Sequence, residues 1–206
     1  MIKIWGRKDA SNVQKVMWCC DELGLTYQRI DIGGKLGGNR EKPYLDLNPN
    51  GLVPTIQDGD FVLWESNAIV RYLVDKYGRG RLLPSTPEGR AEANRWMDWT
   101  RTILSPAFIA LHRAFIRTPP EKRDPALVQS ALEKATGAWR ILDHHLEKSR
   151  YVGGEEFSMG DVAPGVWVSR WFKMPVERPA MTHLERWRGL LCERQPYQLY
   201  VMPGPP

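Results

Sequence analysis

The chain of 206 residues is long enough for one large or two small domains with a sizeable core. Its 29 basic and 24 acidic residues leave a net charge of +5, and 42% of the residues are hydrophobic and 26% charged. These ordinary values exclude a disordered or fibrous chain. No run approaches the roughly 20 apolar residues that cross a bilayer, and no secretion signal follows Met1, so we expect a cytoplasmic protein that does not bind membranes.

The cysteines, histidines and charge distribution narrow the class further. Three cysteines are an odd number, and Cys19 and Cys20 would lie about 100° apart on a helix, so no disulfide framework is implied. Basic residues are spread along the chain with acids beside them, which disfavours nucleic-acid binding. His144 and His145 lie in a solvated, charged stretch without a constellation of metal ligands, and we therefore expect no metal site.

The first quarter of the chain mixes strand and helix periods. A β-prone run at 2–5 leads into a polar loop at 6–10, and apolar residues then repeat at helical spacing from 13 to 23. Residues 26–32 alternate as a second strand. Because a strand-helix-strand order favours a parallel pair with a right-handed crossover, we expect these two strands to pair in parallel.

The next segment predicts a hairpin and a second helix. Short β-prone runs at 55–57 and 61–64 flank a turn, the pattern of two antiparallel strands. Ser66 or Asn67 can cap the helix that follows, and Gly78 ends it. The predicted element order is β-α-β-(α)-β-β-α.

Strand signals stop beyond a polar, proline-containing linker at 79–87. A long helix is expected to begin at Pro87, after the N-cap Thr86, and to bend near Pro106. Three more helices are expected, beginning after Asp124, after Ser158 with an early kink at Pro164, and near Leu184. The second part of the chain is therefore predicted to be all-α.

Four segments carry a resemblance to a known family: 48–55 (NPNGLVPT), 63–69 (LWESNAI), 158–161 (SMGD) and 193–196 (ERQP). The first two segments together resemble the glutathione-binding block of the cytosolic glutathione S-transferases. The third resembles the capping motif of that family's helical domain, and the fourth resembles its usual ending. The likeness runs in register over nearly the whole chain. The opening loop and helix at 6–16 are similar to those of a bacterial branch near the theta and nu classes.

This resemblance implies a thioredoxin-like glutathione-binding domain at 1–78, a linker at 79–87 and a helical-bundle domain at 88–206 that contributes the electrophile site. It implies an enzyme that uses glutathione as co-substrate, without a metal, on a small electrophile or a disulfide. Disulfide reduction or peroxidase activity would accompany conjugation. A homodimer is also expected. The alternative is a non-catalytic member that only binds ligands or proteins.

The γ-glutamyl end of glutathione carries an ammonium and a carboxylate, and Glu65-Ser66 matches the family residues that hold them. A Glu65 carboxylate can accept hydrogen bonds from the ammonium. The Ser66 hydroxyl and the N–H groups that open a helix can hold the carboxylate. Without the resemblance, Ser66 is only a helix cap and Glu65 only a favourable charge at the helix start.

The backbone of glutathione is assigned by the same resemblance. In the family the bond that corresponds to Val53-Pro54 is cis and presents the Val53 N–H and C=O to the cysteinyl residue of glutathione; the alternative is a trans proline opening an edge strand. The glycine carboxylate would be held from the segment after the second strand, where Asn39 is preferred over Lys35 and Arg40.

The family holds the glutathione sulfur as a thiolate through a donor in the loop after the first strand. No tyrosine or cysteine lies in this loop, which leaves the Ser11 hydroxyl or the Asn12 amide. Either residue can instead simply cap the helix. For the second substrate, the resemblance points to an apolar wall on the long helix, with Trp99, Phe108 and His112 as candidates, although aromatic residues at helical spacing are more often core.

Overall fold

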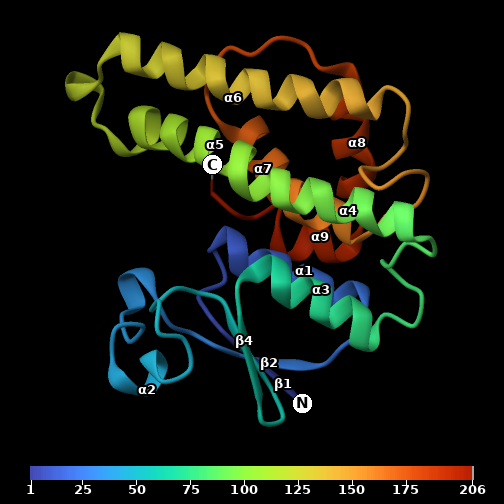
Figure 1. The fold of residues 1–206 in the computed structure, drawn as a ribbon. Coiled ribbons are helices and arrows are strands. Elements are labelled where there is room, and N and C mark those ends of the chain that lie inside the picture. The colour runs from blue at the N-terminus through green and yellow to red at the C-terminus, as the bar shows by residue number, and fades with distance from the viewer. Residues whose placement is uncertain (206) are drawn as a thin grey trace. The chain divides into compact units, whose positions relative to one another are not determined.

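The chain divides into two units in the computed structural model, which describes residues 1–205 (Figure 1). The first unit comprises residues 1–83 and 195–204, and the second comprises residues 84–194 and residue 205. The first unit combines a sheet with helices, and the second is helical, as the sequence predicts.

The first unit is built on a four-stranded sheet of order β2-β1-β3-β4. Its strands are β1 (Ile2–Trp5), β2 (Tyr27–Ile30), β3 (Thr55–Asp58) and β4 (Phe61–Trp64). β1 pairs in parallel with β2 and antiparallel with β3, and β3 forms a hairpin with β4. The predicted parallel pair and hairpin are both confirmed.

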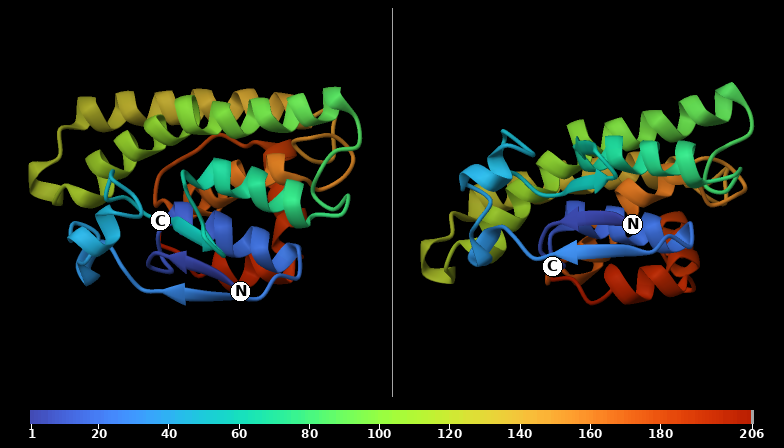
Figure 2. Two further views of the ribbon diagram at one scale, coloured as in Figure 1. Left: turned by 60° about the horizontal axis from the view of Figure 1, so that its bottom comes forward. Right: turned by 90° about the horizontal axis from the view of Figure 1, so that it is seen from below.

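Helices accompany this sheet in the first unit. They are α1 (Ser11–Glu22), α2 (Lys42–Leu45), α3 (Ser66–Tyr77) and α9 (Gln195–Tyr200), with a single 3₁₀ turn, η1 (Gly34–Leu36). Figures 1 and 2 show α1 and α3 side by side on one face of the sheet. Because α1 also contacts α9, all residues from 13 to 20 are buried, including the polar Gln14 and Lys15.

Helix α9 corrects the predicted domain boundary. The sequence assigns residues 88–206 to the helical domain, but α9 packs on α1 of the first unit. The Tyr197 ring lies edge-on to Trp18 with centroids 4.9 Å apart, and the Tyr200 hydroxyl donates to Asp21 over 2.8 Å. These contacts join residues nearly 180 positions apart, so no local pattern could reveal them.

The second unit is helical, and short π-helical and 3₁₀ turns lie between some of its α-helices. Its elements are α4 (Pro87–Trp99), η2 (Thr100–Leu104), α5 (Ser105–His112), η3 (Arg113–Arg117), η4 (Pro120–Lys122), α6 (Pro125–Leu146), α7 (Met159–Lys173) and α8 (Thr182–Cys192). The segments η2 and η3 are π-helical. The π-helical turn η2 lies directly before Pro106, where the sequence predicts a bend, because a proline ring and its missing N–H disturb the preceding helical turn.

Three predicted caps are confirmed in this unit. Thr86 and Asp124 accept hydrogen bonds from the first turns of α4 and α6, and Ser158 forms a capping box with Asp161. The Asp161 carboxylate is fully buried and also accepts from Val152 N–H and Trp187 Nε1. Helix α7 runs on through Pro164 to Lys173. Within residues 1–205, no helix is both long and apolar enough to cross a membrane.

Candidate functional site

The loop between β1 and α1 is held in place by the neighbouring strand. Gly6 N–H donates to Ile30 C=O over 2.9 Å, and Arg7 N–H donates to Ile32 C=O over 3.1 Å. Gly6 has a φ of +155°, and a Cβ at this position would lie 2.4 Å from Val13 Cγ2. The glycine therefore permits the close approach of the loop to α1.

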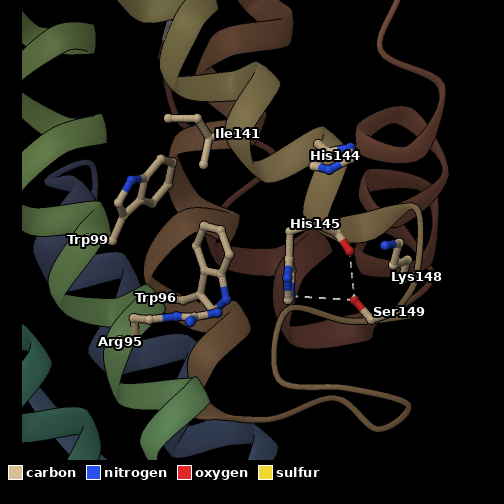
Figure 3. A pocket seen from close by; sticks show the side chains of 8 residues that line it. All are labelled: Arg95, Trp96, Trp99, Ile141, His144, His145, Lys148 and Ser149. Carbon is tan, nitrogen blue, oxygen red and sulfur yellow. Dashed lines mark hydrogen bonds between the residues drawn. The ribbon is translucent and has the colours of Figure 1, made fainter.

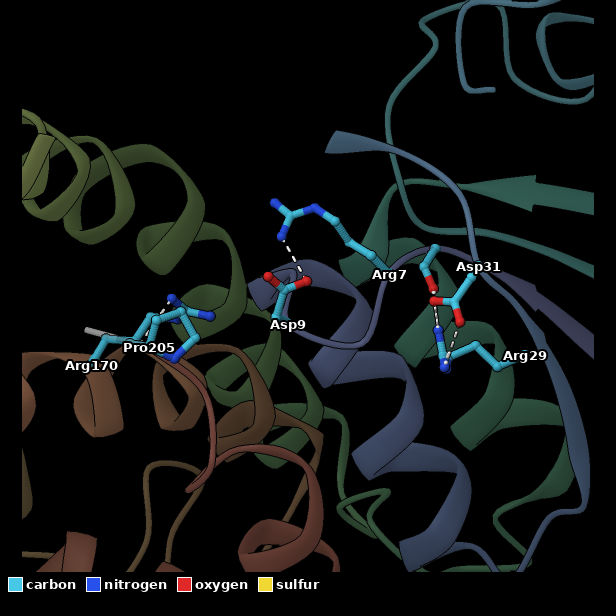
Figure 4. Close-up of polar contacts among 7 residues, drawn as sticks. Arg7, Asp9, Arg29, Asp31, Arg170 and Pro205 are labelled. Carbon is cyan, nitrogen blue, oxygen red and sulfur yellow. Dashed lines mark hydrogen bonds and ion pairs between the residues drawn. The ribbon is translucent and has the colours of Figure 1, made fainter. Parts of the chain in front are cut away.

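Two surface ion pairs brace this loop further (Figure 4). Arg7 forms an ion pair with Asp9 over 2.7 Å within the loop, and Arg29 forms a bidentate ion pair with Asp31. Arg29 Nη1 also donates to Gly6 C=O over 3.1 Å, so β2 contacts the loop through a side chain as well as through its backbone.

In the second unit, the same figure shows Arg170 Nη1 donating to Pro205 C=O over 3.2 Å.

Ser11 and Asn12 are the first two residues of α1, and both are partly exposed. The N-cap is Ala10, so the alternative that Ser11 or Asn12 caps the helix is wrong. Throughout the part of the chain that the structure describes, neither side chain has a hydrogen-bonding partner. Because no acid lies in the first turn, the positive end of the helix is uncompensated there, a favourable place for an anion.

Val53 lies beside this loop and contributes a free backbone edge. The Val53-Pro54 bond is cis, as the resemblance implies, and the trans alternative is wrong. The Val53 side chain packs against the positions of Gly6 and Gly33. Neither the N–H nor the C=O of Val53 has a hydrogen-bonding partner within residues 1–205, so a ligand with an extended backbone can pair with both.

The turn before Val53 is fixed by side chains that bond its carbonyl groups. Asn39 Nδ2 donates to Gly51 C=O over 2.7 Å, and the Tyr44 hydroxyl and Asn48 Nδ2 donate to Leu52 C=O over 2.6 and 2.8 Å. Asn39, the candidate for the glycine carboxylate, thus has one amide proton engaged in bracing this turn and one left for a ligand.

Glu65 immediately precedes α3 and has an unusual backbone. Its φ is +71° and its ψ is 108°, a combination that L-residues rarely adopt. Glu65, and not Ser66 or Asn67, is the N-cap residue, and no side chain caps this helix. The Glu65 side chain is exposed, whereas Ser66 begins the helix and is 6% exposed. An outlier beside an uncapped helix start is typical of a ligand site.

A buried lysine joins α1 to this helix start. Lys15 is 1% exposed, and its Nζ lies 3.5 Å from Ser66 Oγ and 3.4 Å from Asn67 Oδ1. The sequence analysis did not single it out, since its contacts with Ser66 and Asn67 join residues more than 50 positions apart. The local signal is weak, because Lys15 follows the polar Gln14 and its burial does not show in the sequence.

Comparison with known proteins decides the family. Residues 10–76 match the family model described as the glutathione S-transferase N-terminal domain. The chain is 40% identical over 204 residues to glutathione S-transferase GstB of Escherichia coli K12, covering 98% of each chain. The chain belongs to the glutathione S-transferase family. The predicted family and fold class are thereby confirmed.

Solved structures of the glutathione S-transferase family agree. A theta class enzyme from Xanthomonas axonopodis pv. citri, crystallised with glutathione bound, has a TM-score of 0.92 and 45% identity, covering 98% of this chain and 97% of that one. A delta-class glutathione transferase from Nilaparvata lugens has a TM-score of 0.88 and 26% identity, covering 99% and 94%. The theta class likeness fits the predicted bacterial branch.

The three candidates for the electrophile site of this glutathione S-transferase lie in different surroundings. Phe108 is 1% exposed and packs against His112 and Trp167, with ring centroids 6.4 and 5.3 Å away. Trp99 lies elsewhere in the second unit, with its ring edge-on to Trp96 at 5.0 Å. The structure therefore brings Phe108 and His112 together and leaves Trp99 apart from them.

Trp99 lines a pocket of about 530 Å³ between α4 and α6 (Figure 3). The lining residues are Arg95, Trp96, Trp99, Ile141, His144, His145, Lys148 and Ser149. The lining is mainly apolar and includes the cationic Arg95 and Lys148, and neither Phe108 nor His112 is part of it. His144 Nδ1 lies 3.3 Å from a Glu147 carboxylate oxygen, but across residues 1–205 no three His, Cys, Asp or Glu side chains form a metal-binding group.

The two thiols of α1 are poor nucleophiles. Cys19 and Cys20 are fully buried in α1 and Cys192 is partly buried, and within residues 1–205 none of the three forms a disulfide. Burial raises the pKa of Cys20 to about 12 and that of Cys19 well above its usual range. Since the thiolate is the reactive form, these two residues stay protonated and inert at neutral pH.

Proposed function

We propose that the chain binds glutathione on its first unit and holds its sulfur as a thiolate that attacks a small electrophile or disulfide. The observation that carries this proposal is the grouping of three uncommitted features around the sheet. They are the free backbone edge of Val53, the uncapped start of α3 at Glu65-Ser66, and the unpartnered side chains of Ser11 and Asn12.

Each part of glutathione has a chemically suitable partner in this proposal. The exposed Glu65 carboxylate accepts hydrogen bonds from the γ-glutamyl ammonium, and the Ser66 hydroxyl and helix N–H groups donate to the α-carboxylate. The Val53 backbone pairs with the cysteinyl residue in the manner of an added strand. Asn39 donates its second amide proton to the glycine carboxylate.

The α1 start supplies the thiolate stabilisation. A free thiol has a pKa of about 8.5, and lowering it to about 6.5 needs about 2.7 kcal/mol of selective stabilisation of the anion. A hydrogen bond to a charged group contributes roughly 1.5–3 kcal/mol, and a helix N-terminus roughly 0.3–1 kcal/mol. One donor at Ser11, with Asn12 as the second choice, is therefore sufficient.

In the proposed reaction, the thiolate of bound glutathione forms a bond to the second substrate. In conjugation, the thiolate forms a carbon–sulfur bond and the leaving group departs with its electron pair. In disulfide reduction, the thiolate attacks one sulfur of the substrate, forms a mixed disulfide and releases the other sulfur as thiolate. His112 is the proposed polar contact for this substrate, with Trp99 as a separate candidate, whereas Phe108 is 1% exposed and acts only as packing beneath His112.

Substitution of the two donor candidates tests the proposal. We expect Ser11→Ala to lower kcat/KM for glutathione conjugation by about 100-fold, because loss of a charge-assisted bond costs about 2.7 kcal/mol, while calorimetric glutathione affinity changes little. Asn12→Ala is the matched variant on the same helical turn. A large loss in Asn12→Ala alone would reassign the donor, and no loss in either variant or in the double variant would contradict this activation.

We further propose a cytoplasmic homodimer. Single apolar side chains are normal on a surface, but Ile141, 53% exposed, lies beside Trp99 in the pocket of the second unit and offers an apolar contact to a second copy. Mass measurement by light scattering should give twice the monomer mass of 23.7 kDa, and a monomer at micromolar concentration would contradict the proposal.

A further inference from the structure

The contact between Lys15 and the start of α3 is not explained by packing alone. Removing an ammonium group from water is costly, and lysine is among the residues least often fully buried. Lys15 is nevertheless 1% exposed, and its Nζ is directed at Ser66 Oγ and Asn67 Oδ1. An apolar side chain would fill the same space between α1 and α3 at lower desolvation cost, but it could not donate a hydrogen bond to Ser66.

The direction of the hydrogen bond determines what Ser66 can do. An ammonium has three donors and no acceptor, so the Ser66 oxygen must accept from Lys15. The Ser66 hydroxyl proton is then free to donate to a ligand. Lys15 thereby converts an ambiguous hydroxyl, able to donate or accept, into one held as a donor.

The charge of Lys15 adds to that of the helix start. Helix α3 has twelve residues, no side-chain cap and no acid in its first turn. Its first N–H groups carry a partial positive charge of about half an elementary charge. The buried ammonium places a full positive charge beside them, which favours an anion at Ser66 over a neutral group. The exposed Glu65 carboxylate stands next to this positive site and favours a cation.

We infer that Lys15 is a positioning and specificity-determining residue, which fixes Ser66 as a donor and makes the start of α3 selective for the α-carboxylate of the γ-glutamyl group. Lys15 does not touch this carboxylate; it acts through Ser66. This inference rests on the proposed binding of glutathione. Lys15 thereby makes the site favour glutathione over thiols that lack an α-carboxylate at the same place.

The test uses two analogues of S-methylglutathione, which has no thiol and therefore isolates binding from thiolate activation. The 4-aminobutanoyl analogue lacks the α-carboxylate and keeps the amine, and the glutaryl analogue lacks the amine and keeps the carboxylate. Affinities of all three ligands are measured by calorimetry or by competition for the full-length protein. The variants are Lys15→Met, which has a similar volume without the charge, Lys15→Gln, which keeps a donor, and Lys15→Arg, which keeps the charge.

We expect loss of the carboxylate to weaken binding to the wild-type protein by at least about tenfold, and to Lys15→Met and Lys15→Gln by about threefold or less. The penalty for losing the amine should stay unchanged in these variants. In Lys15→Arg, loss of the carboxylate from the ligand should weaken binding almost as much as it does in the wild-type protein. Glu65→Gln should give the opposite pattern. Loss of the amine from the ligand should weaken binding to this variant less than to the wild type, and loss of the carboxylate should weaken it equally.

Lys8→Met is the matched charge control, since Lys8 is an exposed lysine of the same unit, and it should behave as the wild type. Equal weakening of all three ligands in Lys15→Met and Lys15→Gln would indicate a purely structural role and overturn the inference. An unchanged carboxylate penalty would overturn it as well. Failure of the wild-type protein to bind S-methylglutathione would overturn the proposed function itself, and with it the role of Lys15.

Discussion

Glu65 shows how a single residue can be unfavourable for folding and useful for binding. Its backbone, with φ of +71°, costs about 1–3 kcal/mol for a residue with a side chain. This conformation directs the chain from β4 into α3 so that Ser66 opens the helix and the Glu65 carboxylate remains exposed. We interpret the strain as the consequence of placing a carboxylate and a hydroxyl next to each other for the two charges of the γ-glutamyl group.

Replacement of Glu65 by two small residues separates these effects. Glycine is normally less stable than alanine by about 0.5–1 kcal/mol at an ordinary position, but it adopts positive φ without strain. Glu65→Gly should therefore be more stable than Glu65→Ala by about 1 kcal/mol in urea unfolding followed by tryptophan fluorescence. Both variants should lose affinity for glutathione. Greater stability of the alanine variant would contradict the presence of strain.

At the scale of elements, one carboxylate ties the β3–β4 hairpin to α3. Asp58 Oδ2 accepts from the Tyr72 and Tyr77 hydroxyls over 2.7 and 2.5 Å and from Lys76 Nζ over 2.7 Å. Burial acts to raise the pKa of Asp58, but the hydrogen bonds from Lys76, Tyr77 and Tyr72 outweigh it and lower this pKa to about 2. The carboxylate form is thus favoured in the folded state.

This depressed pKa predicts a specific pH dependence. An unfolded aspartate has a pKa of about 3.9, so the contribution of Asp58 to stability is complete above about pH 4 and is lost as the pH falls towards 2. Asp58→Asn should be less stable than the wild type at pH 7, and the difference should shrink between pH 4 and pH 2. Urea midpoints measured at several pH values test this, and a difference independent of pH would contradict it.

The capping box of α7 organises the second unit in a similar way. The buried Asp161 carboxylate accepts from the backbone of Val152 and Ser158 and from Trp187 Nε1. Burial raises the pKa of Asp161 to about 6, in spite of these hydrogen bonds. The side chain therefore connects the start of α7 with the preceding loop and with α8.

Loss of Asp161 should be far more damaging than loss of an exposed cap. In Asp161→Ala three buried donors lose their acceptor at roughly 1–3 kcal/mol each, so we expect a loss of at least about 3 kcal/mol. Asp124→Ala removes the exposed N-cap of α6 and should cost about 1 kcal/mol. Chemical unfolding of both variants tests this ranking. Similar losses in the two variants would contradict the account of the capping box.

The elements that could be predicted are those with local signals. The caps Thr86, Asp124 and Ser158 and the β3–β4 hairpin each follow from a few adjacent residues. The starts of α1 and α3 are each displaced by about one residue from expectation, because Ala10 and Glu65 occupy the N-cap positions without a capping side chain. Local propensity cannot reveal this, since the tertiary structure sets the backbone at both points.

At the scale of the whole molecule, the contacts between distant segments could not be predicted. Helix α9 joins the first unit through Tyr197 and Tyr200, and the buried Lys15 of α1 contacts Ser66 and Asn67 of α3. The family resemblance identified Val53, Pro54, Glu65 and Ser66 as candidates and implied the cis bond at Val53-Pro54, but it gave no backbone conformation for Glu65. The structure adds the free Val53 edge and the positive φ of Glu65.

The central claim is that the first unit activates the thiol of bound glutathione. The most direct measurement is a titration of the thiolate absorbance of glutathione bound to the wild-type protein. We predict a thiol pKa of about 6.5, against about 8.5 for the free thiol. Glutathione that binds with its thiol pKa still at about 8.5 would contradict the claim and indicate a protein that binds glutathione without activating it.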